Sequence, residues 1–299
     1  MTIRDYKFDG SKKLKIKDLP TDAGEDKGKK SELVKQTQVN LLRASELQER
    51  LYAAGREGLV IAIQARDAAG KDSLIRKVFS GLNPAALEVH SFKSPSSTEL
   101  SHDYLWRVHA ALPPRGKIGV FNRSQYEDVL VVRVHHMEKG YKLAPRCLTE
   151  DFFPRRYAQL RNWEDYLYEN GIRMVKLFLN VSKEEQRRRF LERVEREEKH
   201  YKLSTNDMIE RAAWDDYDAA FEDAINATAT PRSPWYVLPA DTKWYTRYLT
   251  SQLLVDTLEE MDPQFPVIDP AEAARIPQML EELGYHEELK TRDSSAAES

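Results

Sequence analysis

The stretch ARDAAGKD, which ends at Asp72, combines residue types that bind phosphate. A P-loop follows the pattern G-x-x-x-x-G-K-[ST], and Gly70 and Lys71 match its second glycine and its lysine. Ala65 stands where the first glycine belongs, and Asp72 replaces the hydroxyl residue that holds magnesium. Asp67 adds another carboxylate inside the loop. The pattern indicates either a loop for phosphates of an unusual kind or an ordinary turn that contains Gly-Lys.

The sequence on both sides of this loop favours a phosphate site. The apolar run GLVIAIQA at 58–65 is typical of a buried parallel strand, and a helical pattern begins over 70–80. At a junction from strand to helix, backbone N–H groups and the helix dipole together bind anions. Gly70 permits close approach of the backbone, and Lys71 supplies a point charge for a phosphate oxygen.

A second candidate motif is KIGVFNRSQYEDV, an apolar strand that ends in Asn122 and is followed by Arg123. In P-loop proteins the end of a neighbouring strand carries the acid that positions magnesium. Asn122 is a neutral oxygen ligand at this position, and Glu127 and Asp128 would restore the negative charge. The same two acids would also favour an ordinary helix N-terminus, so the residues alone leave both interpretations open.

Basic residues cluster around these two motifs. Lys93, Arg107 and Arg133 lie near predicted strand ends or the helices that follow, which is where open α/β sheets bind ligands. The segment 182–202 contains five more arginines: Arg187, Arg188, Arg189, Arg193 and Arg196. Its interleaved acids are typical of a solvated helix with i,i+4 ion pairs. The alternative is a lid that brings arginines to a transferring phosphoryl group.

Composition limits the class of protein. The chain has 299 residues, and 32% of them are charged, yet the net charge is −3, which does not favour a general nucleic-acid binder. The single cysteine, Cys147, excludes an internal disulfide framework and a cysteine-based zinc site. The N-terminus has no apolar core of a signal peptide, and no apolar run approaches the roughly 18 residues of a membrane span. We therefore expect a cytoplasmic protein without a membrane partner.

Strands that alternate with helices predict an α/β fold with a parallel sheet covered on both faces. The predicted strands are 58–65, 87–92, 117–121, 172–179 and 235–239. The predicted helices are 31–55, 70–80, 97–111, 123–132, 149–169, 183–198, 205–227 and 242–260. We expect an irregular arm over 1–30, one domain over 31–285 and a disordered tail over 286–299.

An ordered set of motifs resembles the polyphosphate kinase 2 family from about residue 31 to 260. The motifs are DAAGKDSLIRKVFSGLNP, SFKSPSSTELSHDYLWR, PPRGKIGVFNRSQYEDVLVVRVH, SKEEQRRRFLERV and ATATPRSPWYVLPADTKWYTR. The segment NRSQYEDV is similar to the branch called class III. The resemblance implies a three-layer α/β/α P-loop kinase fold with a five-stranded, mostly parallel sheet and a helical lid at about 182–202.

The resemblance also implies an activity. Members transfer the terminal phosphate of inorganic polyphosphate to nucleotides, reversibly and with Mg²⁺, for which Mn²⁺ is the alternative. The class III branch converts AMP to ADP and ADP to ATP, and guanine nucleotides are further candidate acceptors. A homo-oligomer, either a dimer or a tetramer, is implied as well, and no nucleic-acid partner.

Carried over motif by motif, the resemblance assigns the site residues. The catalytic residues are Asp67, Lys71, Asn122, Arg123 and Glu127, and the metal ligands among them are Asp67, Asn122 and Glu127. Together with the loop, the basic cluster supplies the candidate residues for binding phosphate or nucleotide, which are Ala68, Ala69, Gly70, Lys71, Asp72, Lys93, Arg107, Arg133, Arg187, Arg188 and Arg193. Asp72 is usual in the family, whereas Ala65 departs from the usual glycine and Gln125 from the histidine frequent in this branch.

Two other functions fit the residues. One is a nucleoside monophosphate kinase that uses ATP as its donor, although the loop of such an enzyme is usually richer in glycine. The other is a non-catalytic protein that binds polyanions through its arginines and lysines. The sequence does not determine the preferred base, the preferred chain length of polyphosphate or the net direction of the reaction.

Overall fold

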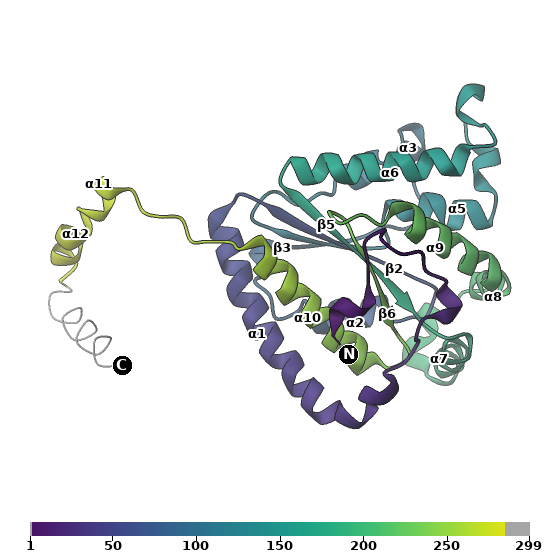
Figure 1. Ribbon diagram of the computed structural model, residues 1–299, viewed down its shortest axis with the longest axis horizontal. Coiled ribbons are helices and arrows are strands. Elements are labelled where there is room, and N and C mark those ends of the chain that lie inside the picture. Colours follow the sequence, from purple (N-terminus) through teal and green to yellow (C-terminus); the bar gives the residue numbers. More distant parts are fainter. Residues whose placement is uncertain (1, 285–299) are drawn as a thin grey trace. The chain divides into compact units, whose positions relative to one another are not determined.

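The computed structural model describes residues 2–284 (Figure 1). The chain divides into two compact units, Met1–Gln264 and a second unit that begins at Phe265. The sequence predicted one domain over 31–285, and the predicted tail at 286–299 lies outside the described residues. The second unit contains the short helices α11 (Pro270–Ala273) and α12 (Ile276–Glu282).

The first unit is built on a six-stranded sheet with the order β1-β6-β5-β2-β4-β3. The strands are β1 (Lys7–Phe8), β2 (Gly58–Ala65), β3 (Leu87–Ser91), β4 (Ile118–Asn122), β5 (Ile172–Asn180) and β6 (Trp235–Pro239). All neighbours are parallel except β1, which pairs antiparallel with β6. The predicted α/β class and the five predicted strands are confirmed. The sixth strand, β1, is only two residues long and therefore has no alternating pattern to reveal it.

Helices cover both faces of the sheet. The longer ones are α1 (Lys30–Ala54), α2 (Lys71–Val78), α6 (Phe152–Glu169), α7 (Lys183–Glu195), α9 (Trp214–Thr228) and α10 (Lys243–Met261). The shorter ones are α3 (Ser97–Ser101), α4 (Trp106–His109), α5 (Val131–Val134) and α8 (Asn206–Ala212). The 3-10 helices that matter for the site are η5 (Gln125–Val129) and η8 (Glu197–Lys202).

The core shows why β2 is central. Successive residues of a strand point to opposite faces, and both faces of β2 are buried. Leu59, Ile61 and Ile63 pack with α1, α2 and α10 on one face. Val60 and Ala62 pack with α6 on the other face. A strand buried on both faces must be continuously apolar, and for this reason the sequence reveals its bounds.

The N-terminal arm is part of the first unit. Ile3, Tyr6, Leu14 and Ile16 are buried, and the Tyr6 hydroxyl lies 3.1 Å from the hydroxyl of Tyr245 on α10. The arm predicted to be irregular therefore consists of short 3-10 helices and β1 packed against the core. Among residues 2–284, no helix is long and apolar enough to cross a membrane.

A buried ion pair ties β5 to α6 beneath the second motif. The Nζ of Lys176 lies 2.6 Å from the Oε2 of Glu164, and the two side chains are 0% and 1% exposed. The hydroxyl of Tyr126, in η5, donates to the Oε1 of Glu164 at 2.7 Å. Lys176 also donates to the carbonyl of Thr228 at 2.9 Å, at the end of α9. Burial lowers the pKa of Lys176, and the charge of Glu164 opposes that shift.

We predict that Glu164→Gln destabilises the protein by about 3 kcal/mol, because it leaves a buried ammonium group without its counter-charge. The free energy of unfolding in urea measures this loss. Asp165→Asn is the matched control on the next residue of α6, whose partly exposed carboxylate faces Arg232 at 3.7 Å. If the two variants lose equal stability, the buried pair that Tyr126 of η5 contacts stabilises the protein no more than an exposed ion pair does.

Candidate active site

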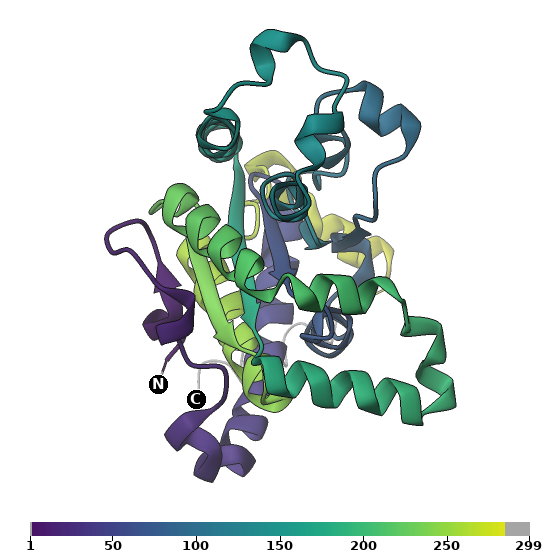
Figure 2. The same ribbon diagram turned by 90° about the vertical axis from the view of Figure 1, so that its right-hand side faces the viewer.

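A cleft of about 900 Å³ lies at the carboxyl ends of β2, β3 and β4. Its walls come from the loop after β2, the segments that follow β3 and β4, and the helices α7, η8, α8 and α9. The segment from α7 to α8 projects from the sheet (Figure 2). Parallel strands end at the same edge of a sheet, and the two sequence motifs meet there for that reason.

The loop after β2 has the geometry of an anion site. β2 ends at Ala65 and α2 begins at Lys71, with Gly70 at φ 110° as the N-cap. Ala68 also has a positive φ of 59°, which is uncommon for a residue with a Cβ. Ala65 has no positive φ, so its backbone conformation does not require the glycine of the usual pattern. Alanine is therefore compatible with the path of the loop at this position.

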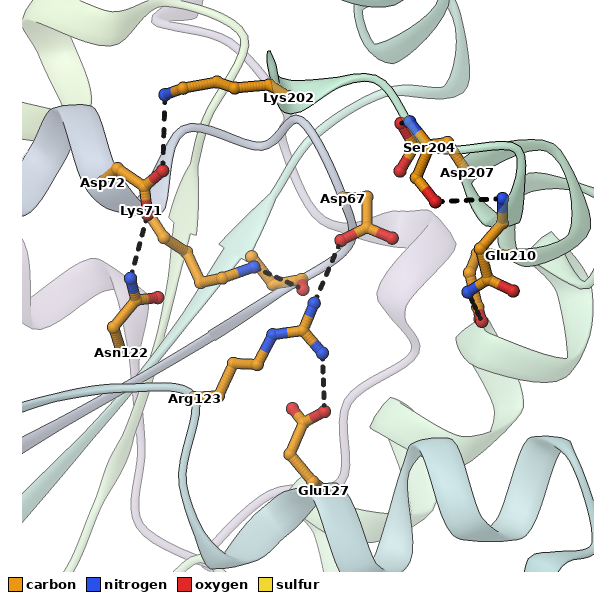
Figure 3. A network of polar contacts seen from close by, with 12 residues as sticks. Asp67, Lys71, Asp72, Asn122, Arg123, Glu127, Lys202, Ser204, Asp207 and Glu210 are labelled. Carbon is orange, nitrogen blue, oxygen red and sulfur yellow. Dashed lines mark hydrogen bonds and ion pairs between the residues drawn. The ribbon is translucent and has the colours of Figure 1, made fainter. Parts of the chain in front are cut away.

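Lys71 lies at the base of the cleft. Its Nζ donates to the carbonyl of Ala65 at 3.1 Å, across the loop (Figure 3). Burial lowers the pKa of Lys71, and the charge of Arg123 lowers it further, while Asp67 opposes the shift. An anion bound beside Lys71 would stabilise its charged form.

Arg123 joins the two motifs electrostatically. Its NH1 donates to the Oε2 of Glu127 at 3.0 Å, and its NH2 to the Oδ1 of Asp67 at 3.3 Å (Figure 3). The charge of Glu127 raises the pKa of Arg123 despite burial. Arg123 has a φ of 65°, a strained conformation of the kind that clusters at functional sites. Two carboxylates from separate motifs thus share one cation in the cleft.

Asp72 is connected to both sides of the cleft. The amide of Asn122 donates to its Oδ1 at 2.9 Å, and the Nζ of Lys202 in η8 lies 3.4 Å from its Oδ2 (Figure 3). Burial raises the pKa of Asp72, but the bond from Asn122 and the charges of Lys202 and Lys71 lower it overall. Asp72 is therefore an ionised group that links α2, β4 and η8.

The structure brings most of the predicted residues together and leaves four arginines outside. Those that line the cleft are Asp67, Ala68, Gly70, Lys71, Asp72, Lys93, Asn122, Arg123, Glu127 and Arg193. Ala69 is buried against the core below the loop.

The remaining four are Arg107, Arg133, Arg187 and Arg188, none of which lines this cleft. Arg107 donates to the carbonyl of Lys93 at 2.7 Å, and Arg133 bonds to the hydroxyl of Tyr157 at 2.7 Å and to Asp223 at 2.5 Å.

Helical periodicity explains the outcome on α7. Arg187 and Arg188 are mostly exposed and pair with Glu184 and Glu185, as expected for a solvated helix face. The cleft instead contacts Gln186, Arg189 and Arg193, which are spaced i, i+3 and i+7 and share one face. This spacing was present in the sequence and would have separated the inward from the outward arginines.

Several residues that line the cleft were not among the predicted site residues. The basic ones are Arg66, Arg76, Arg189, Lys199, Lys202 and Lys243, and the acidic ones include Asp207 and Glu210. Burial raises the pKa of Asp207, and the nearby charge of Asp67 raises it further. Most of these lie far from the two motifs in sequence, and only the return of η8, α8 and α10 to the sheet edge brings them there.

Comparison with known proteins shows the family to which the chain belongs. The family model described as Polyphosphate kinase 2 matches residues 25–266. An ADP-polyphosphate phosphotransferase of Rhodopseudomonas palustris is 46% identical over 81% of this chain and 84% of its own length. An AMP/ADP-polyphosphate phosphotransferase of Meiothermus ruber is 42% identical over 86% of this chain and 92% of its own. The crystal structure of Polyphosphate Kinase 2 from Arthrobacter aurescens superposes with a TM-score of 0.83 and 34% identity, over 93% of this chain and 97% of that one.

We predict that Lys202→Ala weakens the binding of inorganic tripolyphosphate about fivefold, since one charge that lines the cleft is removed. The slope of log affinity against log salt should become shallower by roughly 0.7, the contribution of one neutralised phosphate. Isothermal titration calorimetry at several salt concentrations measures both effects. Arg133→Ala is the control and should leave the slope unchanged, because Arg133 lies outside the cleft. A shallower slope in the control, with none in Lys202→Ala, would contradict this map of the cleft.

Proposed function

The chain belongs to the polyphosphate kinase 2 family, and we propose that it transfers the terminal phosphate of inorganic polyphosphate to both nucleoside monophosphates and diphosphates. The family match makes it an enzyme of polyphosphate-dependent phosphotransfer to nucleotides. The observation that supports the proposal most is the cleft itself, in which Lys71 and Arg123 lie beside a helix start and basic side chains of η8 lie opposite. The dual acceptor range follows the Meiothermus ruber relative, whose name includes both AMP and ADP.

The side chains of the cleft have distinct tasks in this reaction. Phosphoryl transfer requires alignment of the acceptor oxygen with the terminal phosphorus, and positive charge around the equatorial oxygens. The N-terminus of α2 and Lys71 would bind the transferring phosphate. Arg123, which is held between Asp67 and Glu127, would contact the phosphate of the acceptor nucleotide. The lysines of η8 and α10 would hold the polyphosphate chain.

The reaction requires a divalent metal in this kinase family, and we propose Mg²⁺, with Mn²⁺ as the alternative. Asp67, Asn122 and Glu127 offer the hard oxygen donors that Mg²⁺ prefers. In residues 2–284, no three His, Cys, Asp or Glu side chains converge as a metal site. Mg²⁺ usually binds through one or two carboxylates, waters and substrate phosphates, so Asp67 and Glu127 would be sufficient carboxylates on the protein side. When bound, the metal would neutralise charge on the phosphate oxygens.

The shared contact with Arg123 supports this assignment, because Asp67 and Glu127 already hold a positive group between them. The amide nitrogen of Asn122 donates to Asp72. This bond orients the amide oxygen of Asn122, the neutral metal ligand at the end of β4. Cytoplasmic location and assembly into a dimer or tetramer remain predictions.

A direct assay tests the proposed function. Purified protein is incubated with polyphosphate, AMP and Mg²⁺ without ATP, and ADP and ATP are followed by chromatography. We expect both products, and a loss of at least about 10²-fold in Lys71→Ala, the scale of removing one preorganised charge contact. Turnover that requires ATP as donor would instead indicate a nucleoside monophosphate kinase. Binding of polyphosphate without any product would indicate a polyanion-binding protein.

We further predict that Glu127→Gln lowers kcat/KM more for AMP than for ADP. The attacking oxygen of AMP lies one phosphate closer to the nucleoside than that of ADP, so the positive charge that orients it would have to follow it. Glu127 holds Arg123 by an ion pair and would also be a ligand of the metal, so its loss would affect both sources of that charge. The ratio of the two kcat/KM values at saturating polyphosphate measures this effect. Glu184→Gln, at an exposed acid of α7, is the control. Equal losses for both acceptors in Glu127→Gln would refute the role.

A further inference from the structure

Three consecutive carbonyls of the phosphate loop accept hydrogen bonds from one helix, α7. The Nε2 of Gln186 donates to the carbonyl of Asp67 at 3.0 Å. The NH1 of Arg189, one turn further on, donates to the carbonyls of Ala68 at 3.0 Å and Ala69 at 2.6 Å. The outer side of the loop is therefore bonded to a helix that lies 120 residues away in the sequence.

Arg189 is fully occupied by these structural contacts. Its NH2 donates to the carbonyls of Ala240 at 2.6 Å and Asp241 at 3.1 Å, between β6 and α10. Its Nε donates to Glu185 at 2.7 Å, which supplies a counter-charge. The side chain is 5% exposed. A buried guanidinium with all its nitrogens bonded in this way anchors backbone segments and is not free to serve as a phosphate ligand.

The bonded carbonyls determine where the loop N–H groups point. In a trans peptide the C=O and the following N–H point in opposite directions. Carbonyls held by α7 therefore turn the N–H groups of the next residues away from α7. The N–H of Ala69 bonds to the carbonyl of Arg66, whereas those of Ala68 and Gly70 have no acceptor within residues 2–284. These two donors remain for an anion.

The strained residue of the loop lies at the centre of these contacts. Ala68 has a φ of 59°, which costs energy for a residue with a Cβ and persists only when its surroundings impose it. Its carbonyl and that of Ala69 are the two that Arg189 bonds. A further contact continues the network, because Arg211 of α8 donates to the Oε1 of Gln186 at 2.7 Å. Both helices of the projecting segment are thus connected to the loop.

We propose that Gln186 and Arg189 are positioning residues that impose the anion-binding conformation of the phosphate loop. The positive φ of Ala68, which a glycine would adopt without strain, is imposed here by the side chain of Arg189. This inference rests on the proposed function of the same cleft, since it assumes that the loop binds the phosphates of the substrate. It also implies that α7 and the loop stay bonded to each other and move together when substrate binds.

Two conservative variants test the proposal with inorganic tripolyphosphate as the probe. Arg189→Lys keeps the charge but cannot bond four carbonyls at once. Gln186→Met keeps the volume but loses the bond to the carbonyl of Asp67 and the bond accepted from Arg211. Arg196→Lys, at an exposed arginine beyond the end of α7, is the matched control. Affinity is measured by calorimetry at a temperature well below the Tm of each variant, so that all the protein is folded.

We expect Arg189→Lys to weaken tripolyphosphate binding about 10-fold, the scale of lost hydrogen bonds to a charged group, and Gln186→Met to weaken it less. In turnover, the KM for polyphosphate should rise and kcat should fall, because the loop contacts both the donor and the transferring phosphate. A merely structural role would lower the Tm and leave the affinity of the folded protein unchanged.

The outcomes separate this inference from the proposed function. If wild-type protein binds tripolyphosphate and Arg189→Lys binds it equally well, the positioning role is overturned and the proposed function stands. If wild-type protein does not bind tripolyphosphate, the proposed function is wrong, and the positioning role is overturned with it. If Arg196→Lys loses as much affinity as Arg189→Lys, the loss does not depend on the bonds to the loop carbonyls, and the positioning role is again overturned.

Discussion

A loop that binds phosphate must direct its N–H groups toward the anion while its carbonyls find partners elsewhere. This requirement shapes the site, since an unbonded carbonyl in the cleft would repel phosphate and an unbonded buried one would cost stability. In this protein the carbonyls of Asp67, Ala68 and Ala69 bond to α7. Arg189 also bonds to the carbonyls just before α10, so the lid segment is joined both to the loop and to the start of α10. All three lie at the edge where the parallel strands end.

Charge balance in the cleft follows the same logic. Asp67 and Glu127 would repel each other without a cation between them, and Arg123 supplies it. Asp72 is balanced by Lys202 from the opposite wall. Each acid that the usual P-loop pattern lacks is therefore paired with a basic residue from another element. Substrate can replace these ion pairs, because a phosphate can compete with the carboxylates for Arg123 and Lys202. A metal can in turn compete with the two basic residues for the carboxylates.

Burial determines how much of this structure could be predicted from the sequence. β2 was predicted with its observed bounds because both of its faces are buried, so it forms one apolar run. The loop and the second motif were recognised because their residues are consecutive. β1 was missed because two residues carry no pattern. The helix predicted over 97–111 divides into α3 and α4, because periodicity does not show that the first helix ends at Ser101. The one predicted over 123–132 begins as the 3-10 helix η5, whose start is capped by Ser124. The spacing of Arg189 and Arg193 could have placed Arg189 on the inner face of α7, but its role could not be predicted, because its partners are backbone carbonyls that a sequence does not show.

A crystal structure of the protein with tripolyphosphate tests the central claim most directly. The account predicts phosphate oxygens against the loop N–H groups and Lys71, while the carbonyls of residues 67–69 remain bonded to Gln186 and Arg189. Phosphate bound at the loop with those carbonyls released from α7, or phosphate bound away from the loop altogether, would contradict it.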